Sequence, residues 1–171
     1  CVADLRESAP VEQLVAAVMT RIEAGVRSTR EAMLLTDKGR LEVAGKRGVS
    51  AKQLRDWQRR WAPAARGQAL DCARADPLFP LRMRLCIDSG EAPQTIGWLL
   101  LGPRPDGSFF GKDEREALEH VAGPVARAIH IAQLRERRDE QAEKRIGALE
   151  SLIAKLAEAI GAAPAKGAAQ V

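Results

Sequence analysis

The chain has 171 residues, of which 46% are hydrophobic and only 4% aromatic, and its formal net charge is +4. This length suits one ordinary domain with an appendage, and the apolar content is sufficient for a packed core. Basic and acidic residues are interleaved, so no dense basic stripe indicates binding to DNA or RNA, and we expect no nucleic-acid partner. No segment reaches the roughly 20 apolar residues that span a bilayer.

The first elements expected are a helix and a hairpin. Apolar residues recur at spacings of three and four over residues 11–25, which predicts an amphipathic helix. Two short strands follow, over residues 30–36 and 40–46, because the Asp-Lys-Gly sequence at 37–39 is typical of a tight turn.

A second helix is expected over residues 51–61, because Ser50 is a favourable N-cap. Leu54, Trp57 and Trp61 recur on one face of this helix, as expected for a surface that packs on a core. The segment that follows has no clear period and indicates short pieces of strand, loop and turn.

Two further strands form the most distinct structural signal. Residues 81–87 alternate between apolar and polar side chains, which predicts a half-buried strand. Residues 96–101 are almost continuously apolar and end at Gly102 and Pro103, so we expect a central strand with both faces covered. With a helix beginning near Lys112, the element order predicts an α+β fold with an antiparallel sheet between helices.

The remainder of the chain is expected to be helical. Pro124 lies inside an apolar stripe and is expected to kink the helix. From residue 142 onward, apolar residues alternate spacings of four and three over about three heptads, which predicts a coiled coil. We therefore expect a globular domain over residues 1–134, a coiled-coil helix over 135–160 and a flexible tail over 161–171.

Several stretches together resemble a known family. They are the strand and turn ending in LGPRPDGS, the helix start FFGKDEREAL, the helix HVAGPVARAI and the hairpin AMLLTDKGRLEVAGKRG. Over about residues 11–134 the chain resembles a GAF domain of bacterial sensor proteins, especially sensor histidine kinases. This resemblance implies five or six antiparallel strands with helices on both faces, followed by a long C-terminal helix.

The resemblance also implies two kinds of functional residue. A ligand pocket is expected under the helices and loops of one face, lined by Trp57, Trp61, Phe79 and Met83. Homodimerisation through the first and last helices is expected, with an interface at Leu118, Val121, Val125, Ile129, Ile146, Leu149, Ile153 and Leu156. The sequence names no cofactor.

The cyclic-nucleotide motif of some GAF domains is only half present. Phe109 is followed by Asp113 and Glu114 at the motif's spacing, but Gly102 and Pro103 stand where Asn-Lys is expected, which argues against a cyclic nucleotide. The motif's second half also has an ordinary structural role, as a buried aromatic residue before an acidic helix start.

Catalytic and metal-binding patterns are weak. His120 and His130 are ten positions apart on one helix and fall on different sides of it, so we expect no metal site. Cys72 and Cys86 could serve a GAF-fold methionine sulfoxide reductase, but neither lies beside a His or a basic cluster that would activate a thiolate. Arg82 is expected to be solvated or ion-paired, with an anion site as the alternative. No nucleotide-binding or hydrolase motif is present, so we expect no enzyme.

The sequence thus predicts a regulatory domain that relays ligand or partner binding through its last helix to an output module, as in two-component systems. The alternative is a purely structural dimerisation module without a ligand. The three irregularly spaced cysteines suit the cytoplasm, and a cytoplasmic part of a membrane-anchored parent fits equally. Because the chain begins with Cys1 rather than Met, we expect it to be a piece of a longer protein.

Overall fold

The computed structural model describes residues 9–61, 69–90 and 92–161. Its elements in chain order are α1 (Val11–Val26), β1 (Glu31–Asp37), β2 (Arg40–Arg47), α2 (Ala51–Arg60), β3 (Leu70–Cys72), β4 (Leu81–Asp88), β5 (Pro93–Leu101) and α3 (Lys112–Gly161). This order confirms the expected α+β arrangement and adds β3, which falls in the stretch without a clear period. Except for Gly161, the tail predicted at 161–171 lies outside the described residues.

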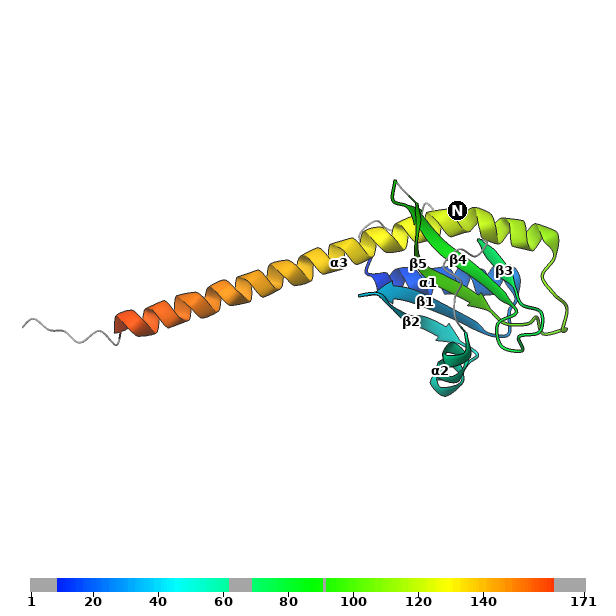
Figure 1. The fold of residues 1–171 in the computed structure, drawn as a ribbon, viewed down its shortest axis with the longest axis horizontal. Helices are drawn as coiled ribbons and strands as arrows, with labels where there is room; N and C mark the ends of the chain where they lie inside the picture. Colours follow the sequence, from blue (N-terminus) through cyan, green and yellow to red (C-terminus); the bar gives the residue numbers. More distant parts are fainter. Residues whose placement is uncertain (1–8, 62–68, 91, 162–171) are drawn as a thin grey trace, which may run out of the picture. The chain divides into compact units, whose positions relative to one another are not determined.

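The five strands form one antiparallel sheet in the order β2-β1-β5-β4-β3 (Figure 1). β5 pairs with β1 on one side and with β4 on the other, so it is the central strand, as its apolar run predicts. The side chains of residues 96 and 98–101 are all buried. The sheet therefore has a core on each of its faces.

The two cores divide the helices between them. On one face, α1 and the first part of α3 pack against residues such as Met33, Met83 and Leu99. On the other face, α2 packs against Leu34 and Trp98 (Figure 1). Successive residues of a strand point to opposite faces, so neighbouring apolar residues enter different cores.

Capping interactions in the local sequence fix the residue at which α2 begins. The Ser50 hydroxyl accepts a hydrogen bond from the Gln53 amide at 3.1 Å, and the Gln53 side chain accepts one from the Ser50 amide at 3.0 Å. This reciprocal capping satisfies two amides that the first helical turn leaves without partners. Leu54 and Trp57 then face the sheet and are buried.

α3 continues as one helix through Pro124, and its residues belong to two compact units. The first unit extends to Gln133 and contains the sheet, and the second begins at Leu134.

The structure corrects part of the expected dimer interface. Leu118, Val125 and Ile129 are only 3%, 5% and 0% exposed. They belong to the core that α3 forms with α1 and the sheet of the same chain, so they offer no surface to a second copy. Val121 is half-buried and lines a groove between α1 and α3 together with Val18.

Candidate functional site

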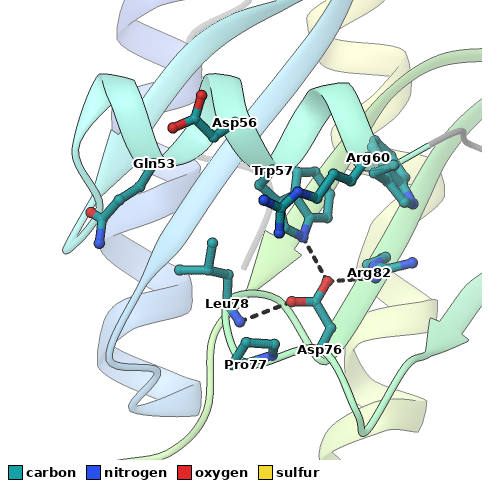
Figure 2. A pocket seen from close by; sticks show the side chains of 9 residues that line it. Gln53, Asp56, Trp57, Arg60, Asp76, Pro77, Leu78 and Arg82 are labelled. Atoms are coloured by element: carbon teal, nitrogen blue, oxygen red, sulfur yellow. Dashed lines mark hydrogen bonds and ion pairs between the residues drawn. The ribbon is translucent and has the colours of Figure 1, made fainter.

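A pocket of about 380 Å³ lies between α2 and the segment that leads into β4 (Figure 2). Among the described residues it is lined by Gln53, Asp56, Trp57, Arg60, Trp61, Asp76, Pro77, Leu78 and Arg82. Its volume falls in the range of small-molecule sites.

The aromatic wall of this pocket comes from the face of α2 that the sequence singled out. Trp57 and Trp61 are one helical turn apart, and their rings stack with centroids 4.6 Å apart. Phe79 meets the ring of Trp57 edge-on at 5.0 Å, and Trp98 meets that of Trp61 at 5.3 Å. Trp57 is buried while Trp61 stays half-exposed, so Trp61 offers more ring surface to a ligand.

Asp76 joins three elements at the base of the pocket. One carboxylate oxygen accepts hydrogen bonds from the backbone amides of Leu78 at 2.9 Å and Phe79 at 3.2 Å. The other accepts hydrogen bonds from Trp57 Nε1 and Arg82 Nη2, both at 2.6 Å (Figure 2). This single side chain therefore links α2, the loop before β4 and β4 itself.

Arg82 is the cationic member of the same network. Besides Asp76, its guanidinium donates to the Phe79 carbonyl at 3.2 Å and to Asp71 at 3.2 Å. It also lies 5.4 Å from the ring centroid of Trp57 and 5.6 Å from that of Trp61, within cation–π range. Its side chain is only 12% exposed, so its charge is held by these partners more than by water.

The network also sets the protonation of Asp76. Burial by itself raises the pKa of this carboxyl, but the hydrogen bonds from Trp57, from two backbone amides and from Arg82 together outweigh burial. The pKa of Asp76 is therefore lowered from its ordinary value of 3.8. The carboxylate stays ionised at neutral pH and keeps its role as acceptor.

The structure brings together only some of the residues expected in this pocket. Trp57 and Trp61 line it, and Phe79 packs behind Trp57 as a fully buried residue. Met83 is in the wrong place for this pocket, because it belongs to the core on the opposite face of the sheet. Its neighbour Arg82 occupies the pocket face instead, in agreement with the expectation that it would be ion-paired.

Sequence reasoning missed Asp76 and did not place Arg82 in the pocket. The alternation of β4 contained the signal for Arg82, since it puts this residue on the face opposite Met83. Asp76 gave no comparable signal, because it lies in a loop without periodicity.

The half-present nucleotide motif has structural roles here. The Glu114 carboxylate accepts a hydrogen bond from the Gly111 amide at 2.8 Å and pairs with Arg104 at 3.1 Å, at the start of α3. The ring of Phe109 contacts Phe110 edge-on and lies 4.6 Å below the guanidinium of Arg74.

The two described cysteines are both free. Cys72 is exposed at the end of β3, and Cys86 is half-buried on β4 with its sulfur 3.7 Å from the Thr95 hydroxyl. The described residues contain no group of three His, Cys, Asp or Glu side chains placed to hold a metal ion. Within the same residues, no helix has the length and apolar character needed to cross a membrane.

Solved structures match this architecture. The GAF domain of a protein assigned as a sensor histidine kinase in Pseudomonas syringae pv. tomato aligns with a TM-score of 0.54 at 20% identity, covering 90% of this chain and 87% of that one. The chain has a GAF-like fold. A GAF domain/HD domain protein from Geobacter sulfurreducens aligns with a TM-score of 0.52 at 15% identity, covering 74% of this chain and 97% of that one.

A third match is a domain of a protein assigned as a two-component sensor histidine kinase in Sinorhizobium meliloti 1021. Its TM-score is 0.55 at 17% identity, and the match covers 77% of this chain and 99% of that one. No protein-family model and no curated protein matches the sequence. The chain therefore shares its fold with GAF domains of bacterial signalling proteins at low sequence identity.

Proposed function

We propose that this GAF-like chain is a non-catalytic sensor domain of bacterial signal transduction. It binds a small molecule at the Trp57–Trp61 pocket and passes the bound state through α3 to an output module. The observation that carries this proposal is the pocket itself, in which a half-exposed indole stands over a buried network centred on Asp76. The structural matches to sensor histidine kinase domains support the same role. The free thiols of Cys72 and Cys86 suit the reducing cytoplasm.

The lining favours a small planar molecule with few polar groups. The stacked rings of Trp57 and Trp61, together with Leu78, form the apolar part of the pocket. The charged lining residues are two aspartates and two arginines, Asp56, Asp76, Arg60 and Arg82, so their formal charges cancel. A flat ring stacked on Trp61, with one or two polar groups directed to the rim, fits this combination.

The relay follows from the way Asp76 connects the elements. A ligand that displaces Trp61 or Trp57 strains the hydrogen bond between Trp57 and Asp76, and through it the bond to Arg82 on β4. β4 pairs along its length with β5, the strand that precedes α3. A ligand that prefers one arrangement of this network shifts the population of the domain toward that arrangement.

The test is thermal unfolding in the presence of nucleotides, flavins and other planar metabolites. A ligand at 100 times its dissociation constant stabilises the folded state by about 2.7 kcal/mol, which raises the midpoint by several degrees. Trp61→Ala is expected to abolish that shift. Arg59→Ala, an exposed residue of α2 outside the pocket, is the matched control and is expected to keep it. A shift that survives in Trp61→Ala would contradict the assignment of the site.

A second candidate function is a dimerisation module without a ligand. The observation that favours it is the row of exposed apolar side chains on α3 beyond Leu134, including Ile146, Leu149 and Ile153. A homodimer in which no compound changes the unfolding midpoint would support this candidate over the sensor.

A further inference from the structure

Arg84 is a cation on the pocket side of the sheet that has no counterion among the described residues. Its side chain is half-buried, its Nε atom is buried, and no described residue accepts a hydrogen bond from this atom. A buried donor without an acceptor is uncommon in folded proteins and requires an explanation. We propose that Arg84 binds the carboxylate of the pocket's ligand, which is a small planar aromatic acid. This inference rests on the proposed function and names the chemical class of its ligand.

The register of the sheet places Arg84 beside the aromatic wall of the pocket. Arg84 is paired with Trp98 across β4 and β5, and residues directly opposite in an antiparallel pair point to the same face. Trp98 belongs to the core that α2 covers, and its ring meets that of Trp61 at 5.3 Å. Arg84 therefore lies next to the indole cluster, two residues along β4 from Arg82 and on the same face.

The same register explains why Arg82 is paired and Arg84 is not. Asp71 of β3 stands opposite Arg82 and accepts a hydrogen bond from its guanidinium at 3.2 Å. One step further along, the Arg84 amide donates to the Ala69 carbonyl at 2.8 Å. The neighbouring residue at this step is an alanine, whose side chain has no acceptor. No ion pair within the described residues includes Arg84.

Two further buried polar atoms of the described residues lack a hydrogen-bond partner, but for a different reason. They are Glu31 Oε2 and Arg47 Nε, whose side chains pair with each other through other atoms at 2.9 Å. The charges of that pair compensate each other, so they leave nothing for a ligand to neutralise. Arg84 differs from both, because its charge has no acid beside it in the described part of the chain.

The charges on this face of β4 favour a monoanion. Arg82 is neutralised by Asp71 and Asp76, so the positive charge of Arg84 is the uncompensated one. A carboxylate matches this single charge, and its two oxygens fit the parallel N–H donors of a guanidinium. A phosphate monoester carries more than one negative charge at neutral pH and would also meet the field of the two aspartates beside Arg82. The aromatic part of the acid follows from Trp61, whose half-exposed ring offers a surface for stacking.

The tryptophans of the chain make a direct binding assay possible. The chain contains three of them, and the structure gathers all three in this cluster, as Trp57, Trp61 and Trp98. Their fluorescence therefore reports on the site itself. Titrations with benzoate and nicotinate, and with benzamide and nicotinamide, compare a charged with a neutral group on the same ring. We expect the acid to bind on the order of tenfold more tightly than its amide.

Substitutions of Arg84 test whether this residue causes the preference. Arg84→Gln removes the charge and is expected to bring acid and amide to about equal affinity, while Arg84→Lys is expected to keep a reduced preference. Arg59→Gln removes an exposed arginine of α2 outside the pocket, and this matched control is expected to keep the full preference. A preference for the acid that survives in Arg84→Gln would overturn the assignment. Tighter binding of phenyl phosphate than of benzoate would overturn the carboxylate class.

Unfolding without a ligand separates a binding role of Arg84 from a structural one. Arg84→Met removes the charge at similar volume, and the urea midpoint is expected to stay unchanged or to rise, because no ion pair is broken. Arg82→Met is the comparison, and its midpoint is expected to fall, because Asp76 is left buried without its cation. A fall in Arg84→Met as large as that in Arg82→Met would show that Arg84 holds the fold together and would overturn the inference.

The outcomes also separate this inference from the proposed function. Equal binding of acid and amide that is lost in Trp61→Ala refutes the acid class but supports the pocket. The same conclusion follows if neither benzoate nor nicotinate binds while a planar compound without a negative charge raises the thermal midpoint. If no compound binds in the titrations or in the thermal measurements, the proposed function fails and this inference fails with it.

Discussion

Asp76→Asn is the most informative single change in the pocket, because it preserves shape and alters only one end of the network. The remaining carbonyl oxygen can still accept the hydrogen bonds from the Leu78 and Phe79 amides. The new amide group, however, replaces the oxygen that accepts from Trp57 and Arg82. The N–H groups of Trp57 and Arg82 then face another hydrogen-bond donor. The side chains of Arg82 and Asp76 are only 12% and 13% exposed, so water cannot easily replace the lost acceptor.

The magnitude follows from the bonds lost. A neutral hydrogen bond from Trp57 contributes about 1 kcal/mol and a charge-assisted one from Arg82 about 1.5–3 kcal/mol. Removing one partner of a buried ion pair costs roughly 3–5 kcal/mol, because the other charge stays buried. We expect a loss of about 3–5 kcal/mol in the free energy of unfolding. Asp71→Asn is the matched control, since Asp71 pairs with the same Arg82 but is 48% exposed, and it is expected to cost less than about 1 kcal/mol.

Urea unfolding followed by far-UV circular dichroism measures both variants, and a pH series adds a second check. The folded state lowers the pKa of Asp76, so the folded carboxyl binds a proton less readily than the unfolded one. Its stabilising contribution is therefore present above the unfolded value near 3.8 and is lost as the pH falls through the lower folded pKa. The difference in free energy of unfolding between the wild type and Asp76→Asn is therefore expected to decrease as the pH is lowered. Equal costs for Asp76→Asn and Asp71→Asn at neutral pH would refute the network as described.

Four further substitutions concern the scaffold, and urea unfolding measures each of them. Ser50→Ala removes the capping hydroxyl of α2 and is expected to cost about 1 kcal/mol. Gly97→Ala would drive a Cβ into a backbone carbonyl of β1 and is expected to cost several kcal/mol, whereas Gly123→Ala meets no atom within 4 Å and is expected to stabilise α3 by up to about 1 kcal/mol. Burial raises the pKa of Glu31 from 4.5 against the opposing effect of Arg47, so its contribution to stability is present below 4.5 and lost as the pH rises through the folded pKa. Glu31→Gln is expected to remove this dependence of the free energy of unfolding on pH. A pH dependence equal to that of the wild type would contradict the prediction.

Most of the fold follows from periodicity and capping, and these are local properties of the sequence. The boundaries of α1, the hairpin of β1 and β2, and the Ser50 cap of α2 all agree with the sequence within one or two residues. β3 was not predicted as a separate strand, because three residues with one buried side chain show no period. Ile96 shows a further limit of predicting burial from strand alternation. Register shifts by one residue between Gly97 and Thr95, so this bulged position enters the α1 core against the simple alternation.

The pocket was harder to predict because periodicity tells which residues share a face, but not which helix covers that face. Met83 and Arg82 lie on opposite sides of β4, as alternation requires. Whether α1 or α2 covers the Met83 side depends on tertiary packing, and both helices have apolar faces. Asp76 depends on packing even more, since its partners come from three separate elements.

The same ambiguity affects α3, where one apolar pattern serves two purposes. Along a column of every seventh residue, Val125 and Ala132 are buried in the core of their own chain, whereas Ile146 is 56% exposed. Exposed Asp139 stands between them in this column and interrupts the apolar surface. In this column, the apolar residues before Asp139 are covered within the chain, whereas Ile146 after it is exposed. Periodicity alone does not tell which apolar residues are covered within the chain, and burial distinguishes the core of the GAF-like domain from the exposed residues of the second unit.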